Sequence, residues 1–237
     1  MEQAEMLQKM IDVGVHLGHR KSKGHPKMKP YLFGVRQNIQ IINVEKTLQK
    51  MQEAAAFLKE VAGRNGTILF VSTKMPAKPF TKEFAQRLSI PYVSERWLGG
   101  TLTNFPVISK RLEYFLSQEA QKAKGELEKY TKKEQLMIDR ELEDLEKKMG
   151  GLKTLKQLPN ALIMVDIEEH STALREAIRM GVPTVAITDT NTDPTLVNFP
   201  IPANDKSGKS VRFILDYLAA AIEEGKNESK VHKVESP

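Results

Sequence analysis

The sequence predicts an α/β protein built on a doubly wound parallel sheet of about five strands. Three observations support this class. Strands such as residues 67–72 and 161–167 are apolar throughout, which is typical of a sheet covered on both faces. These strands alternate with segments of helical period, as in crossover units. Residues 105–151 interrupt the alternation without any strand pattern, which indicates a helical insertion.

The α/β body is expected to comprise residues 1–104 and 152–225. Residues 4–13 show helical spacing, and a hairpin is predicted from 31–36 and 39–44. Asn43 is a candidate N-cap for a helix that ends near residue 64. The other expected elements are a helix at 79–88, a strand at 90–93, a helix at 171–180, strands at 182–188 and 198–201, and a closing helix at 207–224.

The insertion at 105–151 is predicted to be an antiparallel coiled-coil hairpin. Thr131 and Glu134 have the spacing of a capping box, so a helix should begin there. Two interpretations of the arm remain open, a solvated self-stabilised hairpin and a lever that contacts RNA or a partner. Apolar residues recur in the second arm with coiled-coil spacing at Ile138, Leu142, Leu145, Met149 and Leu152.

The polar tail at 226–237 is predicted to be disordered.

The positive charge is unevenly placed. The 237 residues include 36 Lys and Arg against 30 Asp and Glu, a formal net charge of +6. No acidic residue lies between Asp12 and Glu45, and glycines and prolines there favour a loop. This stretch predicts a polyanion contact, with a solvated basic loop as the alternative. Its basic residues and histidines are Arg20, Lys21, Lys23, Lys27, Lys29, Arg36, His16, His19 and His25.

Composition excludes several classes of protein. The chain has no cysteine, which excludes disulfide scaffolds, Cys-ligated metal sites and thiol nucleophiles. Its apolar runs fall far short of the roughly 20 residues that span a bilayer. The first residues are acidic and lack the apolar stretch of a secretory signal, so a cytoplasmic location is expected.

Nucleotide-enzyme motifs are absent. The chain contains no G-x-G-x-x-G, GxxxxGK[ST] or G-x-S-x-G pattern. The turn at Gly99 and Gly100 is an alternative phosphate nest, although it lacks a lysine. Trp97, just before this turn, is interpreted as a core residue, with base stacking as the alternative.

The segment 189–194, DTNTDP, follows a predicted strand at the edge where doubly wound sheets bind ligands. Three interpretations remain open: a capped structural loop, a metal site aided by His16 and His19, and a catalytic loop. Two competing functions follow for the whole chain. One is a metal-dependent phosphate-binding or phosphotransfer enzyme, and the other is a coiled-coil adaptor that binds only protein.

Several motifs together resemble a known family. They are GVHLGH at 14–19, PKMKPY at 26–31, IINVEKT at 41–47, ILFV at 68–71, RWLGGTLTN at 96–104, TKKE at 131–134 and AITDTN at 186–191. In this order they resemble the bacterial small-subunit ribosomal protein two family, over roughly residues 6–222. The resemblance implies a flavodoxin-like body, a protruding coiled-coil hairpin and a cytoplasmic place on the 30S subunit. It also implies binding to 16S ribosomal RNA and to neighbouring proteins, including the large OB-fold mRNA-binding one, with no catalytic role, small-molecule substrate or membrane.

Charge and position within this resemblance predict the rRNA contacts. They are Arg20, Lys21, Lys23, His25, Lys27, Lys29, Arg36, Lys74, Lys78, Arg96, Lys110 and Arg111. A divalent metal, zinc or magnesium, is a further hypothesis, with His19, Asp189 and Asp205 as ligands. The chain departs from the family pattern at three places, with Gly24 and His25 ahead of Pro26, Thr195 where an acid is frequent, and KSGK at 206–209. The first departure removes an aromatic stacking group, and the others leave the metal set less acidic.

Overall fold

The computed structural model describes residues 2–75 and 77–234. Its centre is a five-stranded parallel sheet with the strand order β5-β4-β6-β7-β8. Numbered from the first strand of the sheet, this is the order 2-1-3-4-5 of flavodoxin-like folds. The predicted α/β class and parallel sheet are confirmed. The strands are β4 (Ile68–Val71), β5 (Tyr92–Val93), β6 (Ala161–Val165), β7 (Thr184–Thr188) and β8 (Phe199–Pro202).

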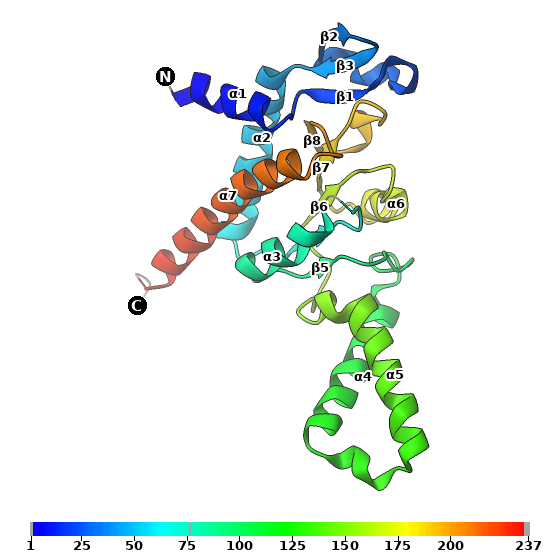
Figure 1. The fold of residues 1–237 in the computed structure, drawn as a ribbon. Helices are drawn as coiled ribbons and strands as arrows, with labels where there is room; N and C mark the ends of the chain where they lie inside the picture. Colours follow the sequence, from blue (N-terminus) through cyan, green and yellow to red (C-terminus); the bar gives the residue numbers. More distant parts are fainter. Residues whose placement is uncertain (1, 76, 235–237) are drawn as a thin grey trace.

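Helices cover both faces of this sheet (Figure 1). Alternate strand residues explain why, since Ile68 and Phe70 belong to one apolar cluster and Leu69 and Val71 to the other. The first cluster includes α2 (Val44–Gly63), α3 (Lys78–Leu88) and α7 (Gly208–Val234), and the second includes α6 (Ser171–Met180). Strands buried on both faces carry no polar alternation, as their composition predicted.

A second, smaller sheet precedes the body. The helix α1 (Glu2–Asp12) leads into an antiparallel sheet of order β1-β3-β2. The hairpin of β2 (Leu32–Arg36) and β3 (Ile39–Ile42) was predicted, and Gln37 and Asn38 both have the positive φ of a tight two-residue turn. Its third strand, β1 (Leu17–Arg20), was not predicted, because this short segment lacks an alternating pattern of its own and pairs with β3.

The predicted helix starts are confirmed at two caps. The Asn43 side chain accepts a hydrogen bond from the Glu45 amide at 2.9 Å and so begins α2. Thr131 and Glu134 form the capping box of α5 (Lys132–Met149). Such side chains satisfy amides that have no partner within the first turn.

The insertion consists of α4 (Phe105–Ala123) and α5, which project from the body at the end opposite the small sheet (Figure 1). Of the predicted seam, Leu142, Leu145, Met149 and Leu152 are buried, and Ile138, nearer the tip, is partly buried. These residues belong to an apolar cluster that also includes residues of the body, so the coiled-coil seam stays a prediction.

The closing helix corrects the predicted tail. α7 continues to Val234, so residues 226–234 are helical; residues 235–237 lie outside the described residues. Gly225 does not stop the helix, because it lies where α7 crosses α2. Beyond it, Lys59 of α2 pairs with Glu228 at 2.8 Å. No helix in the described part of the chain is both long and apolar enough to cross a membrane.

The α2–α7 crossing predicts opposite effects for two glycines. A Cβ on Gly225 would lie 2.2 Å from the Lys59 carbonyl oxygen, so Gly225→Ala should cost about 1–3 kcal/mol of unfolding free energy. The control is Gly63→Ala, whose Cβ would lie 3.7 Å from the Gly225 carbonyl and should stabilise the helix by up to about 1 kcal/mol. Urea unfolding measures both, and equal stability of the two variants would contradict the close approach.

Candidate nucleic-acid interface

The basic segment, residues 20–29, begins at Arg20, the last residue of β1, and lies largely on the surface. It contains two short 3₁₀ helices, η1 (Lys21–Lys23) and the start of η2 (Pro26–Tyr31). Four of its cations are exposed and make no ion pair with any described residue: Arg20, Lys21, Lys23 and Lys29. A local excess of unopposed positive charge is the feature that attracts a polyanion.

Thr190 holds the basic segment against the body. It follows β7, is 0% exposed, and accepts two backbone hydrogen bonds from the small sheet and its loop. The amide of His19 donates to the Thr190 hydroxyl at 2.8 Å, and the amide of His25 donates to its carbonyl at 2.8 Å. Gly18 permits this approach, because a Cβ there would lie 2.4 Å from Thr190 Cγ2. The segment is thus fixed on both sides of Lys21 and Lys23.

Lys27 has a different environment from its neighbours. Its Nζ atom lies 2.7 Å from Asp193 Oδ2 and 3.0 Å from the Thr195 hydroxyl. Burial raises the pKa of Asp193, but the hydrogen bonds from Lys27 and Thr195, with the charge of Lys27, together outweigh it and lower that pKa to about 2. Lys27 therefore ties the basic segment to the loop after β7, with its charge already balanced.

The other predicted contacts do not form one patch. Arg36 ends β2 near the basic segment, and Arg96 is exposed ahead of the glycine turn. Lys78 pairs with Glu95 at 2.8 Å. Lys110 and Arg111 are exposed on α4, in the arm that projects from the far end of the body (Figure 1).

Lys74 is engaged inside the protein. It lies after β4, and its Nζ atom is 2.7 Å from both Asp166 Oδ2 and Asp205 Oδ1. Asp166 follows β6, so this ion cluster occupies the switch point between β4 and β6, where doubly wound sheets bind ligands. Lys74 thus neutralises the protein's own carboxylates, a role different from the predicted phosphate contact.

Within this cluster, the carboxyl group of Asp205 has a raised pKa. Burial, with repulsion from Asp166 and Asp189, raises the pKa of Asp205 to about 7, although Lys74 opposes the shift. Near pH 7 Asp205 is therefore protonated in a fraction of the folded molecules, whereas an unfolded chain would release this proton.

The metal hypothesis does not fit this geometry. His19 Nδ1 lies 3.0 Å from Asp189 Oδ2 but outside hydrogen-bonding geometry, while Asp205 faces Lys74. Across residues 2–75 and 77–234, no group of three or more His, Cys, Asp or Glu side chains is arranged to hold a metal ion. The cation near these carboxylates is the ammonium of Lys74.

His170 was not singled out from the sequence. Its Nδ1 donates to the Asp166 carbonyl at 2.7 Å, and its Nε2 accepts from the Thr73 amide at 3.1 Å. Burial lowers the pKa of His170, so the ring is neutral at neutral pH and structural. Asp166 had a usable signal, an acid directly after a buried strand at the ligand edge; His170 had none.

The glycine turn at 99–100 does bind an anion, and the anion is Glu176 of α6. This buried carboxylate accepts hydrogen bonds from Trp97 Nε1 at 3.0 Å and from the amides of Gly100 at 2.8 Å and Leu102 at 2.9 Å. Thr103 donates from its amide and hydroxyl as well. The alternative of a phosphate nest is therefore wrong for this fold, because the donors are already used. Burial raises the pKa of Glu176, but these donors outweigh it and keep the pKa below its usual range.

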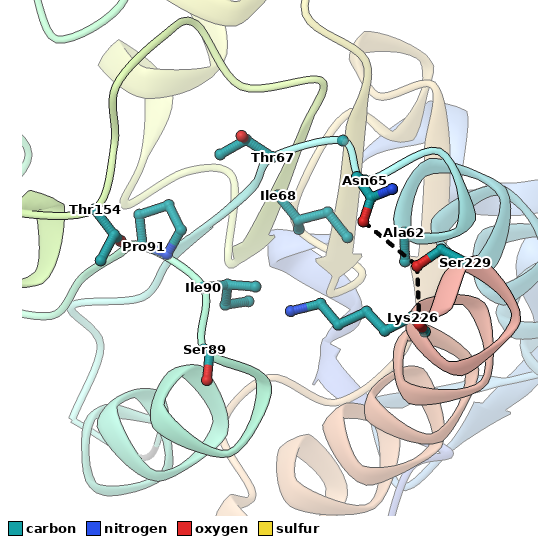
Figure 2. Close-up of a pocket in the computed structure, with 11 residues that line it drawn as sticks. Ala62, Asn65, Thr67, Ile68, Ser89, Ile90, Pro91, Thr154, Lys226 and Ser229 are labelled. Atoms are coloured by element: carbon teal, nitrogen blue, oxygen red, sulfur yellow. Dashed lines mark hydrogen bonds between the residues drawn. The ribbon is translucent and has the colours of Figure 1, made fainter. Parts of the chain in front are cut away.

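Another hollow, of about 310 Å³, lies at the opposite end of the parallel sheet. Figure 2 shows the Lys226 side chain extending into it towards Ile90, with Ser229 and Asn65 on one side. The ammonium donates to the carbonyl of Leu88 at the end of α3. Lys226 thus joins α7 to α3, which makes this hollow part of the scaffold and separate from the basic segment.

Two comparisons with known proteins bear on these features. The family model described as Ribosomal protein S2 matches residues 10–225. A curated relative, small ribosomal subunit protein uS2 of Roseiflexus castenholzii (strain DSM 13941 / HLO8), is 44% identical over 218 residues. The match covers 92% of this chain and 83% of the relative.

Glu176 predicts a stability effect with a defined pH dependence. Glu176→Gln replaces a charged acceptor by an amide that also presents donors, so about 2–4 kcal/mol of unfolding free energy should be lost at pH 7. Because the folded pKa is lowered, this contribution is present at neutral pH and disappears as the pH falls through it. The difference in unfolding free energy between Glu176→Gln and the wild type should therefore become smaller at acidic pH. Urea unfolding measures it, with exposed Glu169→Gln as the control; equal urea midpoints at pH 7 would refute the role.

Asp205 predicts the opposite pH dependence. Its folded pKa is raised, so ionisation of Asp205 opposes folding increasingly as the pH rises from about 4 to above 7. Asp205→Asn should be more stable than the wild type at pH 5.5, and by a larger margin at pH 8. Thermal unfolding at both pH values tests this, with exposed Asp216→Asn as the control. A variant that loses stability equally at both pH values would count against a protonated Asp205.

Proposed function

This chain belongs to the ribosomal protein S2 family, and from that premise we propose that it is a structural component of the small ribosomal subunit which binds 16S ribosomal RNA through its basic segment. The observation that carries the proposal is a row of exposed, unopposed cations on a loop whose backbone is fixed to a rigid sheet.

The proposed mechanism is phosphate neutralisation by a preorganised loop. Arg20, Lys21, Lys23 and Lys29 supply the charge, and each phosphate contact releases condensed counterions, so binding should weaken steeply with salt. Such contacts position a protein without reading sequence. Specificity would then come from the shape of the folded RNA, which the fixed spacing of these side chains matches. Arg36 lies at the edge of the same surface.

The arm is proposed as a second contact. Lys110 and Arg111 are exposed on α4, and the arm holds them away from the basic segment (Figure 1). Two separated contacts would fix the orientation of the protein on the particle better than one, because the second contact becomes intramolecular.

A protein partner is also proposed, and the small sheet supports it. Phe33 is 81% exposed and Val35 is 50% exposed, beside a largely apolar hollow of about 270 Å³ lined by Ile11, Phe33 and Ile41. Exposed apolar patches of this kind are typical of protein interfaces. We assign this surface to a neighbouring ribosomal protein, the large OB-fold mRNA-binding one.

The enzyme alternative has little support. The family is one of structural ribosomal proteins. At the switch point, Lys74 and two carboxylates neutralise one another, and the glycine turn is occupied by Glu176. A phosphate group would have to displace the protein's own side chains from either place.

The basic segment predicts a selective loss of binding. Lys21→Glu with Lys23→Glu should lower the affinity for small-subunit particles depleted of this family member at least tenfold, and should reduce the slope of log affinity against log salt. Thermal stability should be nearly unchanged, because both side chains are exposed. Co-sedimentation at several salt concentrations measures the binding.

The matched control is Lys82→Glu with Lys156→Glu, which makes the same change in net charge at exposed positions outside the segment. This control should bind as the wild type does. If both double variants lose the same affinity, the effect comes from net charge and the assignment to the basic segment is wrong.

A further inference from the structure

A groove runs along α6 beside the basic segment. Two hollows, of about 420 and 400 Å³, share the side chains of Ile178 on α6 and Leu196 on the short helix η5 (Pro194–Leu196). His25 of the basic segment lines the first. We call this surface the α6 groove. Each hollow is within the size range of ligand sites, about 300–1,000 Å³.

The floor of the α6 groove is apolar and open to solvent. Ile178 is 54% exposed and Leu196 is 48% exposed, whereas Leu174, deeper in the first hollow, is buried. Exposed aliphatic side chains from two different elements that face one hollow offer a flat surface for an apolar or aromatic group.

The rim of the α6 groove is positively charged. Arg175 lines the first hollow, and Arg179 follows it by one helical turn. Both arginines are exposed and form no ion pair with the described residues. The acid on the opposite side, Asp193, is already bound by Lys27. Glu168 also lines the first hollow and is bound only by the neutral side chain of Asn191, so its charge opposes one of the two arginines. The net charge that remains at this rim is positive, from two arginines against one carboxylate.

One wall presents a hydrogen-bonding edge. Asn191 donates to the carboxylate of Glu168, and both residues line the first hollow. The Asn191 Oδ1 atom is buried, so the acceptor that this wall presents is the exposed carboxylate of Glu168. A carboxylate can accept hydrogen bonds from the amino and imino groups of a nucleobase.

We propose that the α6 groove receives an unstacked nucleotide of 16S ribosomal RNA, with its base against Ile178 and Leu196 and its phosphates at Arg175 and Arg179. The inference rests on the proposed function and extends it, because the basic segment neutralises phosphates whereas the groove holds a base. RNA is favoured over a protein segment by the net positive charge of Arg175 and Arg179 against Glu168 and by continuity with the basic segment at His25. Single-stranded RNA is commonly held by such a combination of packing surface and cations.

Two substitutions separate the base contact from the phosphate contact. Ile178→Ser should lower the affinity for depleted small-subunit particles about tenfold without changing the salt slope, because packing of a base releases no counterions. Arg175→Ser should lower the affinity and reduce the salt slope by about one. Met180→Ser, on the same helix and 39% exposed but outside the groove lining, is the control and should bind normally. Thermal unfolding of each variant checks that the fold is retained.

Ultraviolet cross-linking of wild-type particles, followed by mass spectrometry, identifies the occupant. A nucleotide cross-linked within residues 171–180 or 191–198 supports the proposal, and a cross-link from these segments to a protein overturns it. Wild-type affinity in both groove variants also overturns it. If Lys21→Glu with Lys23→Glu weakens binding while the groove variants do not, only this inference fails. If the wild type does not bind the particles, the proposed function fails.

Discussion

The hydrogen bonds to Thr190 decide where this protein presents its positive charge. Thr190 is fully buried after β7, and it binds the backbone at His19 and His25, on both sides of Arg20, Lys21 and Lys23. These two hydrogen bonds restrain a surface loop against a rigid sheet that is covered on both faces. Cations held in place lose less conformational entropy on binding a polyanion than cations on a free loop would. Gly18 is part of the same constraint, because any larger residue would separate β1 from Thr190.

The places where this fold usually binds ligands are filled from within. At the switch point, Lys74 lies between Asp166 and Asp205, and at the glycine turn the Glu176 carboxylate takes the donors that a phosphate would take. Both arrangements satisfy buried charge with opposite charge or hydrogen bonds, which a low-dielectric interior requires. The α/β body therefore acts as a rigid scaffold, and its outer surfaces remain available to bind partners.

Glu176 also joins the loop that leads into the arm to the body, where Leu102 and Ile108 pack into the same apolar cluster as Ala173. It fixes residues 97–103, which lead directly into α4, to the helix α6 on the body. The other side of α6 carries Arg175 and Ile178 at the groove. One helix thus positions the base of the arm and one wall of a surface hollow, both at a fixed distance from the basic segment. This sharing explains how a single rigid body could present several contacts to one large partner.

The sequence by itself determined the elements whose signals are local. The buried strands, the hairpin turn at Gln37 and Asn38, the Asn43 cap and the capping box at Thr131 were all predicted, because apolar period and capping depend on residues within a few positions of each other. The exposure of Lys21 and Lys23 also followed from a stretch with no acids and many turn residues. Only the tertiary structure decided which charges remain available. Lys27 is matched by Asp193, Lys74 by Asp166 and Asp205, and the glycine turn by Glu176. The tertiary structure also decided that residues 17–20 form a strand, because β3 pairs with them. It decided that α7 continues beyond Gly225, where Lys59 of α2 pairs with Glu228. These partners lie tens of residues or more along the chain from the residues they match, so no local pattern encodes them, and only the folded sheet brings them within contact distance.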